Sequence, residues 1–134
     1  MAGYKSAEEM SQVLARMAEL MASDPGLVEA SRRTNVAVAY EFRDLGVSFY
    51  TRMGNGSVEG GLGEIANPDV RIMMKSSVFD GIFSGTLNAM SAYEMGQLSF
   101  TGNMSAAMRL EGLVGNFGRV YRQAKADCLG EQKQ

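Results

Sequence analysis

The sequence contains no histidine and no tryptophan, and it has only one cysteine and two prolines. Because histidine is a frequent general base and metal ligand, its absence excludes a Ser-His-Asp triad, most zinc sites and a histidine-bound haem. The single cysteine, Cys128, excludes a disulfide within the chain and fits a reducing compartment. No apolar run reaches the roughly 18 residues that a membrane-spanning helix needs. These absences favour a binding function over catalysis.

The charge balance argues against a further class of protein, the nucleic-acid binders. The 134 residues carry a net charge of −2 at pH 7, and the isoelectric point is about 5.2. Nucleic-acid binding relies on clustered positive charge, so no nucleic-acid partner is expected. The first ten residues lack the apolar stretch of a signal peptide, and the last three are not Ser-Lys-Leu, a peroxisomal address. We therefore expect a cytoplasmic protein.

Several residues that could carry chemistry are better explained as structural. The run Gly60-Gly61-Leu62-Gly63 lacks the Gly-Lys-Ser/Thr of a phosphate loop, which indicates a bulge or a loosely packed edge strand. Glu94 and Glu111 are expected on solvated faces, and Cys128 is expected as a semi-buried structural thiol. The sequence thus predicts no enzyme activity, no metal site and no cofactor.

The chain length suits one domain over residues 1–134, with an N-terminal helical segment at 1–33 and a flexible tail at 131–134. Ser6 followed by Glu9 forms the sequence of a capping box, which predicts a helix over residues 7–23. Asp24-Pro25 should end that helix, because the residue before proline avoids the helical region. Residues 27–33 are expected to form a short second helix or a turn.

Three strands are predicted next, over residues 35–45, 47–53 and 57–62. In the first, Val36, Val38, Tyr40 and Phe42 alternate with smaller or charged residues. The connections 44–46 and 54–56 both end in glycine, which is typical of hairpin loops. The three strands should therefore form an antiparallel meander.

The second half alternates strands and helices. Val70, Ile72 and Met74 predict a strand with one buried face. A helix capped by Ser77 and ended by Gly85 should follow, then a short helix over 89–95 and a strand over 97–101. Asn103 could cap the next helix. The last helix has Leu113, Phe117, Val120, Tyr121 and Ala124 on one face, while Gly112, Gly115 and Gly118 interrupt its start.

Four stretches of this part of the sequence occur in a fixed order: Asn67-Pro68-Asp69-Val70, Val78-Phe79 with Ile82, Gly85-Thr86-Leu87-Asn88, and Met95-Gly96-Gln97-Leu98-Ser99-Phe100-Thr101-Gly102-Asn103. This ordered set resembles the sterol carrier protein-2 family of lipid-binding domains. The resemblance covers roughly residues 35–124, and its most specific part is a helix, a glycine, a short strand, Gly-Asn and another helix. The sequence also has eleven methionines, whose flexible side chains suit a surface that adapts to varied apolar partners.

The resemblance implies an α+β fold, in which a five-stranded, largely antiparallel sheet with helices on one face encloses a hydrophobic tunnel. The periodicity alone would favour an ordinary core. The resemblance instead favours a tunnel that binds a fatty acid, an acyl-CoA, a sterol or an isoprenoid without covalent chemistry, and that could transfer it. The expected lining residues are Phe79, Ile82, Phe83, Met90, Tyr93, Leu98, Phe100, Met104, Met108 and Phe117.

Other partners stay open at this point. The chain could be an accessory substrate-binding or dimerisation module for a separate enzyme, since domains of this family also occur within larger enzymes such as alkylsulfatases. A Met-rich face could instead form a homodimer without any cavity. Arg119, Arg122 and Lys125 form a basic strip, which we expect to be a solvated face rather than a site of transient membrane contact.

Overall fold

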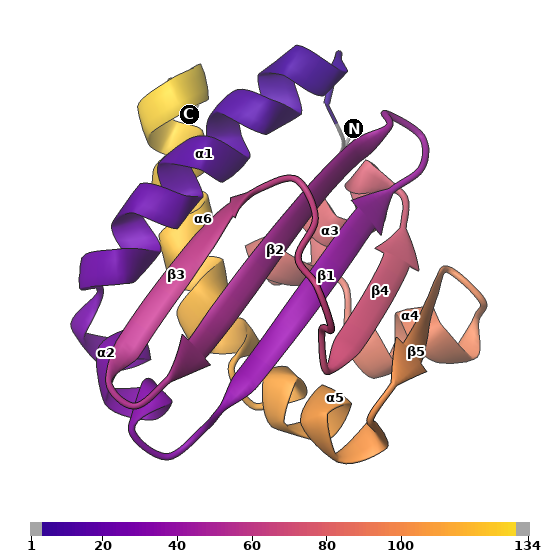
Figure 1. Ribbon diagram of the computed structural model, residues 1–134. Coiled ribbons are helices and arrows are strands. Elements are labelled where there is room, and N and C mark those ends of the chain that lie inside the picture. The colour runs from indigo at the N-terminus through magenta and orange to yellow at the C-terminus, as the bar shows by residue number, and fades with distance from the viewer. Residues whose placement is uncertain (1–3, 131–134) are drawn as a thin grey trace.

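The computed structural model describes residues 4–130. It has a five-stranded sheet of order β3-β2-β1-β4-β5, and its helices lie behind the sheet and along the β3 edge (Figure 1). β1 and β4 are parallel, whereas the other neighbouring strands are antiparallel. The predicted α+β fold with a largely antiparallel five-stranded sheet is thereby confirmed. No helix among residues 4–130 is long and apolar enough to cross a membrane.

The N-terminal segment forms two helices, α1 (Ala7–Ser23) and α2 (Pro25–Ser31). The Ser6 side chain accepts a hydrogen bond from the Glu9 amide, as predicted. The Glu9 carboxylate accepts from the amide of Lys5 rather than from that of Ser6, so the capping box is displaced by one residue. Asp24 ends α1 and caps α2 by accepting from the Leu27 amide, so the second helix starts earlier than expected.

The predicted meander is present as β1 (Val36–Phe42), β2 (Val47–Gly54) and β3 (Ser57–Leu62). Gly46 turns the first hairpin with a φ of 68°, a conformation that glycine adopts without steric cost. The apolar residues of β1 that alternate in sequence are all buried. That face of the sheet therefore forms the floor of the core.

The connection from β3 to β4 (Val70–Met74) crosses the other face of the sheet and brings β4 next to β1 (Figure 1). Asp69 joins the two strands at their starts. Its carboxylate accepts from the Ala37 amide at 2.8 Å, and its own amide donates to the Ala37 carbonyl at 2.8 Å. The Asn-Pro-Asp segment of the sequence resemblance thus fixes a junction between strands that are far apart in the chain.

Helix α3 (Ser76–Ser84) begins differently from the prediction. Ser77 does not cap it; Lys75 is the N-cap residue and its side chain makes no capping bond. Asp44 of the first hairpin supplies the cap instead. Its carboxylate accepts hydrogen bonds from the Ser76 amide at 2.9 Å and from the Ser76 hydroxyl at 2.6 Å. Gly85 ends α3 in the left-handed conformation, with a φ of 89°, as expected.

The remaining elements are α4 (Ala89–Glu94), β5 (Leu98–Gly102), α5 (Met104–Glu111) and α6 (Val114–Leu129). Asn103 caps α5 by accepting from the Ala106 amide at 3.0 Å, as predicted. α6 packs against α1 and α3, and the apolar face predicted for it is buried. Figure 1 shows α4, β5 and α5 grouped at the edge of the sheet opposite to α1.

An aromatic cluster fills the core between the sheet, α3 and α6. The ring of Phe79 lies 4.9 Å from that of Phe42, 4.5 Å from that of Phe83 and 5.3 Å from that of Tyr121, measured between centroids. The Phe83 ring stacks on Phe117 at 6.3 Å. These contacts join α3 to β1 on one side and to α6 on the other.

The basic strip is not simply a solvated face. Arg119 pairs with Asp24 at 2.5 Å, and Arg122 donates to the Phe83 carbonyl at 3.3 Å. Lys125 is half-buried and pairs with Asp80 of α3 at 2.8 Å. All three side chains therefore join α6 to neighbouring elements.

Two further expectations concern the end of the chain. Cys128 was expected to be semi-buried, but it is exposed, because its position on α6 faces outward near α1. The expected flexible tail at 131–134 lies outside the described residues.

Candidate ligand-binding cavity

An apolar cavity of about 190 Å³ lies between the β4–β5 side of the sheet and helices α3, α4 and α5. For scale, an apolar cavity of about 150 Å³ holds a benzene molecule. This one can therefore hold a ring or a short stretch of alkyl chain. Its wall is formed by Tyr40, Ile72, Met74, Ile82, Phe83, Ala89, Met90, Tyr93, Leu98, Phe100, Met104, Ala107, Met108, Leu110, Glu111 and Val114.

The floor of the cavity follows from strand pairing. Ile72 lies opposite Phe100, and Met74 lies opposite Leu98, across the antiparallel β4–β5 pair. Directly paired residues project to the same face of a sheet, so these four side chains form one apolar surface. Tyr40 is paired with Ile72 across the parallel β1–β4 pair and extends the surface inward.

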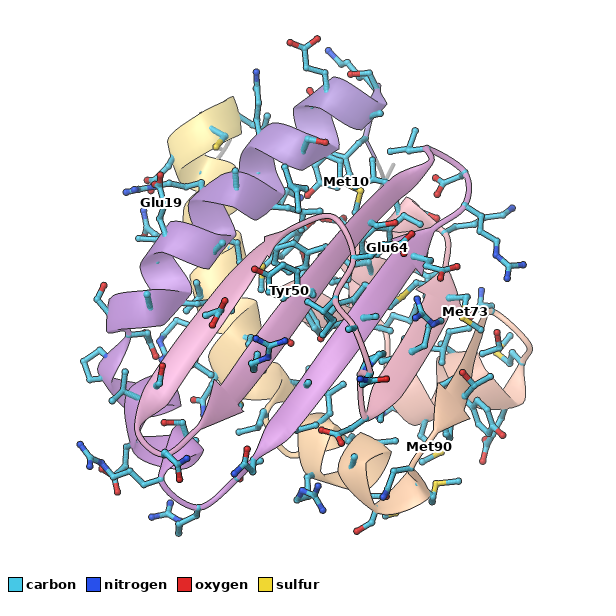
Figure 2. All side chains as sticks on the ribbon, in the orientation of Figure 1. Met10, Glu19, Tyr50, Glu64, Met73 and Met90 are labelled. Carbon is cyan, nitrogen blue, oxygen red and sulfur yellow. The ribbon has the colours of Figure 1, made fainter. Side chains whose placement is uncertain are left out.

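The outer wall comes from α4 and α5, whose apolar side chains are only partly covered. Met90 and Tyr93 of α4 are 43% and 44% exposed, and Met104 and Met108 of α5 are 56% and 58% exposed. Figure 2 shows Met90 beside α4, β5 and α5, at the corner where these elements meet. Large exposed apolar patches often mark a binding site. We call Met90, Tyr93, Met104 and Met108 the apolar rim of the cavity.

The polar groups of the cavity wall are few. Apart from the methionine sulfurs, only the side chains of Tyr40, Tyr93 and Glu111 carry polar atoms. No lysine or arginine is among the lining residues. Glu111 and Tyr93 are exposed, so both reach solvent. The wall can therefore bury hydrocarbon, but it offers no cation to neutralise a buried anion.

Tyr40 differs from the other two polar residues because it is only 2% exposed. Burial raises the pKa of Tyr40 to about 12, and the Thr51 side chain opposes this only in part. Thr51 lies near enough to influence the hydroxyl, but the two do not form a hydrogen bond. Within residues 4–130 the Tyr40 hydroxyl is the one fully buried side-chain polar atom without a hydrogen-bond partner.

Eight of the ten lining residues expected from the sequence lie on the cavity wall. Their contact with a ligand stays a prediction. Phe79 and Phe117 lie elsewhere: they are 0% and 1% exposed and belong to the aromatic core. The eight that line the wall are Ile82, Phe83, Met90, Tyr93, Leu98, Phe100, Met104 and Met108.

The sequence reasoning missed the other half of the wall. The pairing of β4 with β5 would have indicated Ile72 and Met74, because both lie on the face shared with Leu98 and Phe100. Ala89 and Ala107 carry no distinguishing pattern, since alanine is common in any helix. The residues missed are Tyr40, Ile72, Met74, Ala89, Ala107, Leu110, Glu111 and Val114.

Nothing in the described part of the chain resembles a metal centre. No three histidine, cysteine, aspartate or glutamate side chains within residues 4–130 gather closely enough to hold an ion. The cavity wall supplies only one carboxylate, that of Glu111. The cavity wall is thus suited to non-covalent burial of an apolar molecule.

Solved structures of known proteins resemble this chain in fold. The sterol carrier protein 2 of Yarrowia lipolytica in its apo form has a TM-score of 0.66 and 18% identity, over 85% of this chain and 96% of that one. The sec-alkylsulfatase Pisa1 from Pseudomonas sp. has a TM-score of 0.58 and 18% identity, over 64% of this chain and 14% of that one. These likenesses show the fold.

Sequence comparison adds a relative and a family. The peroxisomal multifunctional enzyme A of Dictyostelium discoideum is 39% identical over 61 residues, which are 46% of this chain and 14% of that protein. The chain therefore spans only about one seventh of the multifunctional enzyme and of the alkylsulfatase. The model of the SCP-2 sterol transfer family matches residues 15–115. Because that match covers most of the sequence, the chain belongs to the SCP-2 sterol transfer family.

Proposed function

We propose that this protein binds a lipid-like molecule without covalent chemistry and releases it to an acceptor. The observation that carries the proposal is an apolar cavity that opens through the apolar rim. Membership of the SCP-2 sterol transfer family supports it. A cavity wall with one carboxylate and no cation favours binding over catalysis, so we propose that the chain alone is not an enzyme.

The size of the cavity determines what part of a ligand is covered. Burial of a methylene contributes about 0.8 kcal/mol, so about six methylenes contribute about 5 kcal/mol before the costs of ordering. A sterol or a long acyl chain exceeds a volume of about 190 Å³. Such a ligand would extend past the rim, or α4 and α5 would move outward to enlarge the cavity. Both alternatives place the rest of the ligand against Met90, Tyr93, Met104 and Met108.

A fluorescence titration tests the proposal. A fluorescent fatty-acid analogue should bind saturably, with micromolar or better affinity, and long-chain lipids should displace it. Mass spectrometry of an organic extract of the purified protein should show a lipid at a constant ratio to protein. Absence of saturable binding across fatty-acid, acyl-CoA and sterol probes, with the protein folded, would contradict the proposal.

A second candidate is an accessory module of a separate enzyme. The apolar rim and the nearby Met95, which is 72% exposed, favour it because an enzyme chain or a second copy could cover them. Two larger relatives contain a similar region as about one seventh of their length. Sedimentation velocity over a range of concentrations distinguishes the candidates: a carrier stays monomeric without lipid, whereas a dimerisation module associates.

The proposed function has consequences for where the protein is found and for its contact with membranes. We propose a cytoplasmic protein, with the peroxisome as the alternative because one relative is named as peroxisomal. Transient contact of the apolar rim with a membrane would let a ligand leave without crossing water. Transfer of a fluorescent lipid to vesicles should then accelerate with vesicle concentration.

A further inference from the structure

The hydroxyl of Tyr40 is a polar atom in an otherwise apolar interior. The Tyr40 side chain lines the cavity, is 2% exposed, and has no hydrogen-bond partner for its hydroxyl. A buried hydroxyl without a partner lowers stability, and buried polar groups in proteins are nearly always paired. The ring itself is well packed, since its centroid lies 5.9 Å from those of Phe49 and Phe79.

We propose that the Tyr40 hydroxyl forms a hydrogen bond with an oxygen atom at the buried end of the ligand. This inference rests on the proposed function and specifies the ligand of the same cavity. Tyr40 lies at the inner end of the cavity floor, paired with Ile72 of β4, whereas the exposed residues Tyr93 and Glu111 lie on the helices. The ligand would therefore enter with an oxygen-bearing end first and leave its hydrocarbon remainder at the apolar rim.

The absence of lysine and arginine from the cavity wall favours a ligand whose buried oxygen is uncharged. A carboxylate buried beside Tyr40 would find no lysine or arginine among the lining residues to neutralise its charge. Burial raises the pKa of Tyr40 to about 12, so its hydroxyl stays protonated and able to donate at neutral pH. A hydroxyl, carbonyl or ester oxygen fits these conditions. The ligand class is thus a neutral lipid with an oxygen at its buried end.

Thr51 is the competing partner on the protein. It is buried on β2, near the Tyr40 hydroxyl, and forms no hydrogen bond with it in this structure. If Thr51 satisfied the hydroxyl, Tyr40→Phe would destabilise the unliganded protein. If the ligand satisfies it, Tyr40→Phe should leave the melting temperature of the unliganded protein unchanged or higher, because an unpaired buried group is removed.

The test compares two small probes, 1-octanol and n-octane, as competitors of the neutral dye N-phenyl-1-naphthylamine. In Tyr40→Phe the affinity for 1-octanol should fall about three- to tenfold, the usual effect of losing one hydrogen bond, while the affinity for n-octane stays constant. Octanoate at pH 8 should compete more weakly than 1-octanol in the unchanged protein. Tyr50→Phe, which removes the hydroxyl of a tyrosine outside the cavity wall, and Thr51→Val are the controls, and both should keep the ratio of octanol to octane affinity.

Each outcome is decisive. A ratio of octanol to octane affinity that is the same in Tyr40→Phe and in the unchanged protein would overturn the inference and leave the proposed function intact. A lower melting temperature of Tyr40→Phe without ligand, or a ratio that changes as much in Thr51→Val, would assign the hydroxyl to Thr51 and also overturn it. If the dye, octanol and octane all fail to bind, the proposed function itself is contradicted.

Discussion

The carbonyl oxygen of Phe83 on α3 lies 2.7 Å from the position that a Cβ atom on Gly118 of α6 would occupy. A real Cβ atom does not approach a backbone oxygen so closely, so the two helices can pack at this distance only because residue 118 is glycine. Phe83 lines the cavity, and its ring stacks on Phe117 of α6. The close packing of α3 on α6 therefore holds one wall of the cavity in place.

Gly118→Ala should lower the free energy of unfolding by about 1–3 kcal/mol, because the added methyl group forces α3 and α6 apart. Gly115→Ala is the matched control. Gly115 lies in the same helix, and a Cβ atom added there would have no neighbour within 4 Å, so alanine should raise stability by up to about 1 kcal/mol through helix propensity. Urea denaturation of both variants measures the difference. Equal effects of the two substitutions would contradict the packing argument.

Met108→Ala should weaken lipid binding with little loss of stability. Met108 lines the cavity but is 58% exposed, so few packing contacts are lost on truncation, and stability should change by no more than about 0.5 kcal/mol. Loss of about one methylene of contact corresponds to roughly a fourfold lower affinity. Met95→Ala is the control, since Met95 is 72% exposed and lies outside the cavity wall. Equal affinities of the two variants would show that Met108 does not contact the ligand.

Asp44→Ala should destabilise α3 although Asp44 lies in a hairpin loop. Its carboxylate bonds both the amide and the hydroxyl of Ser76, which makes it the cap of a helix 32 positions later in the chain. Loss of a capping side chain costs about 0.5–2 kcal/mol. Asp44→Asn retains one oxygen acceptor and should cost less. Thermal unfolding of the two variants, with Ser77→Ala as a control that should be nearly neutral, distinguishes this cap from the one expected from sequence.

Alkaline pH should destabilise the fold through its buried tyrosines. Burial raises the pKa of Tyr40 to about 12 and also raises that of Tyr121, whereas tyrosine in an unfolded chain ionises near pH 10. Between about pH 10 and pH 12 the unfolded chain releases protons that the folded state keeps. Each tyrosine should therefore remove up to about 1.4 kcal/mol of stability per pH unit as the pH rises, and this stability is fully present below pH 10.

Denaturation midpoints between pH 9 and pH 12 measure this dependence. Tyr40→Phe should show a shallower decline over that interval, because phenylalanine does not titrate. The same decline in the variant and in the unchanged protein would show that Tyr40 is not shielded from solvent.

The local parts of the fold were predictable from the sequence. Ser6, Gly46, Gly85 and Asn103 act through neighbours a few residues away, so their roles in caps and turns follow from the chain itself. The cap of α3 was not predictable in this way, because Asp44 reaches it only after the sheet has formed.

The cavity was predictable only in part for a related reason. Phe79, Phe83 and Phe117 are the same residue type on helical faces, yet only Phe83 lines the cavity. Their difference depends on how α3 and α6 are rotated toward the sheet, which the sequence pattern does not encode locally. Tyr40 was expected on the buried face of β1, but its missing partner becomes visible only when every neighbouring side chain is in place.

The central claim is that the cavity between the β4–β5 side of the sheet and α3 to α5 holds the ligand. The most direct test fills this cavity with a larger side chain and measures the affinity for the ligand. Ala107→Phe places a ring into the cavity from α5, and Ser105→Phe places the same ring on an exposed position of the same helix, away from the cavity wall. Titration with a fluorescent fatty-acid analogue should show at least about a tenfold loss of affinity in Ala107→Phe and little change in Ser105→Phe, with both variants folded by circular dichroism. Unchanged affinity in folded Ala107→Phe would mean that the ligand binds elsewhere.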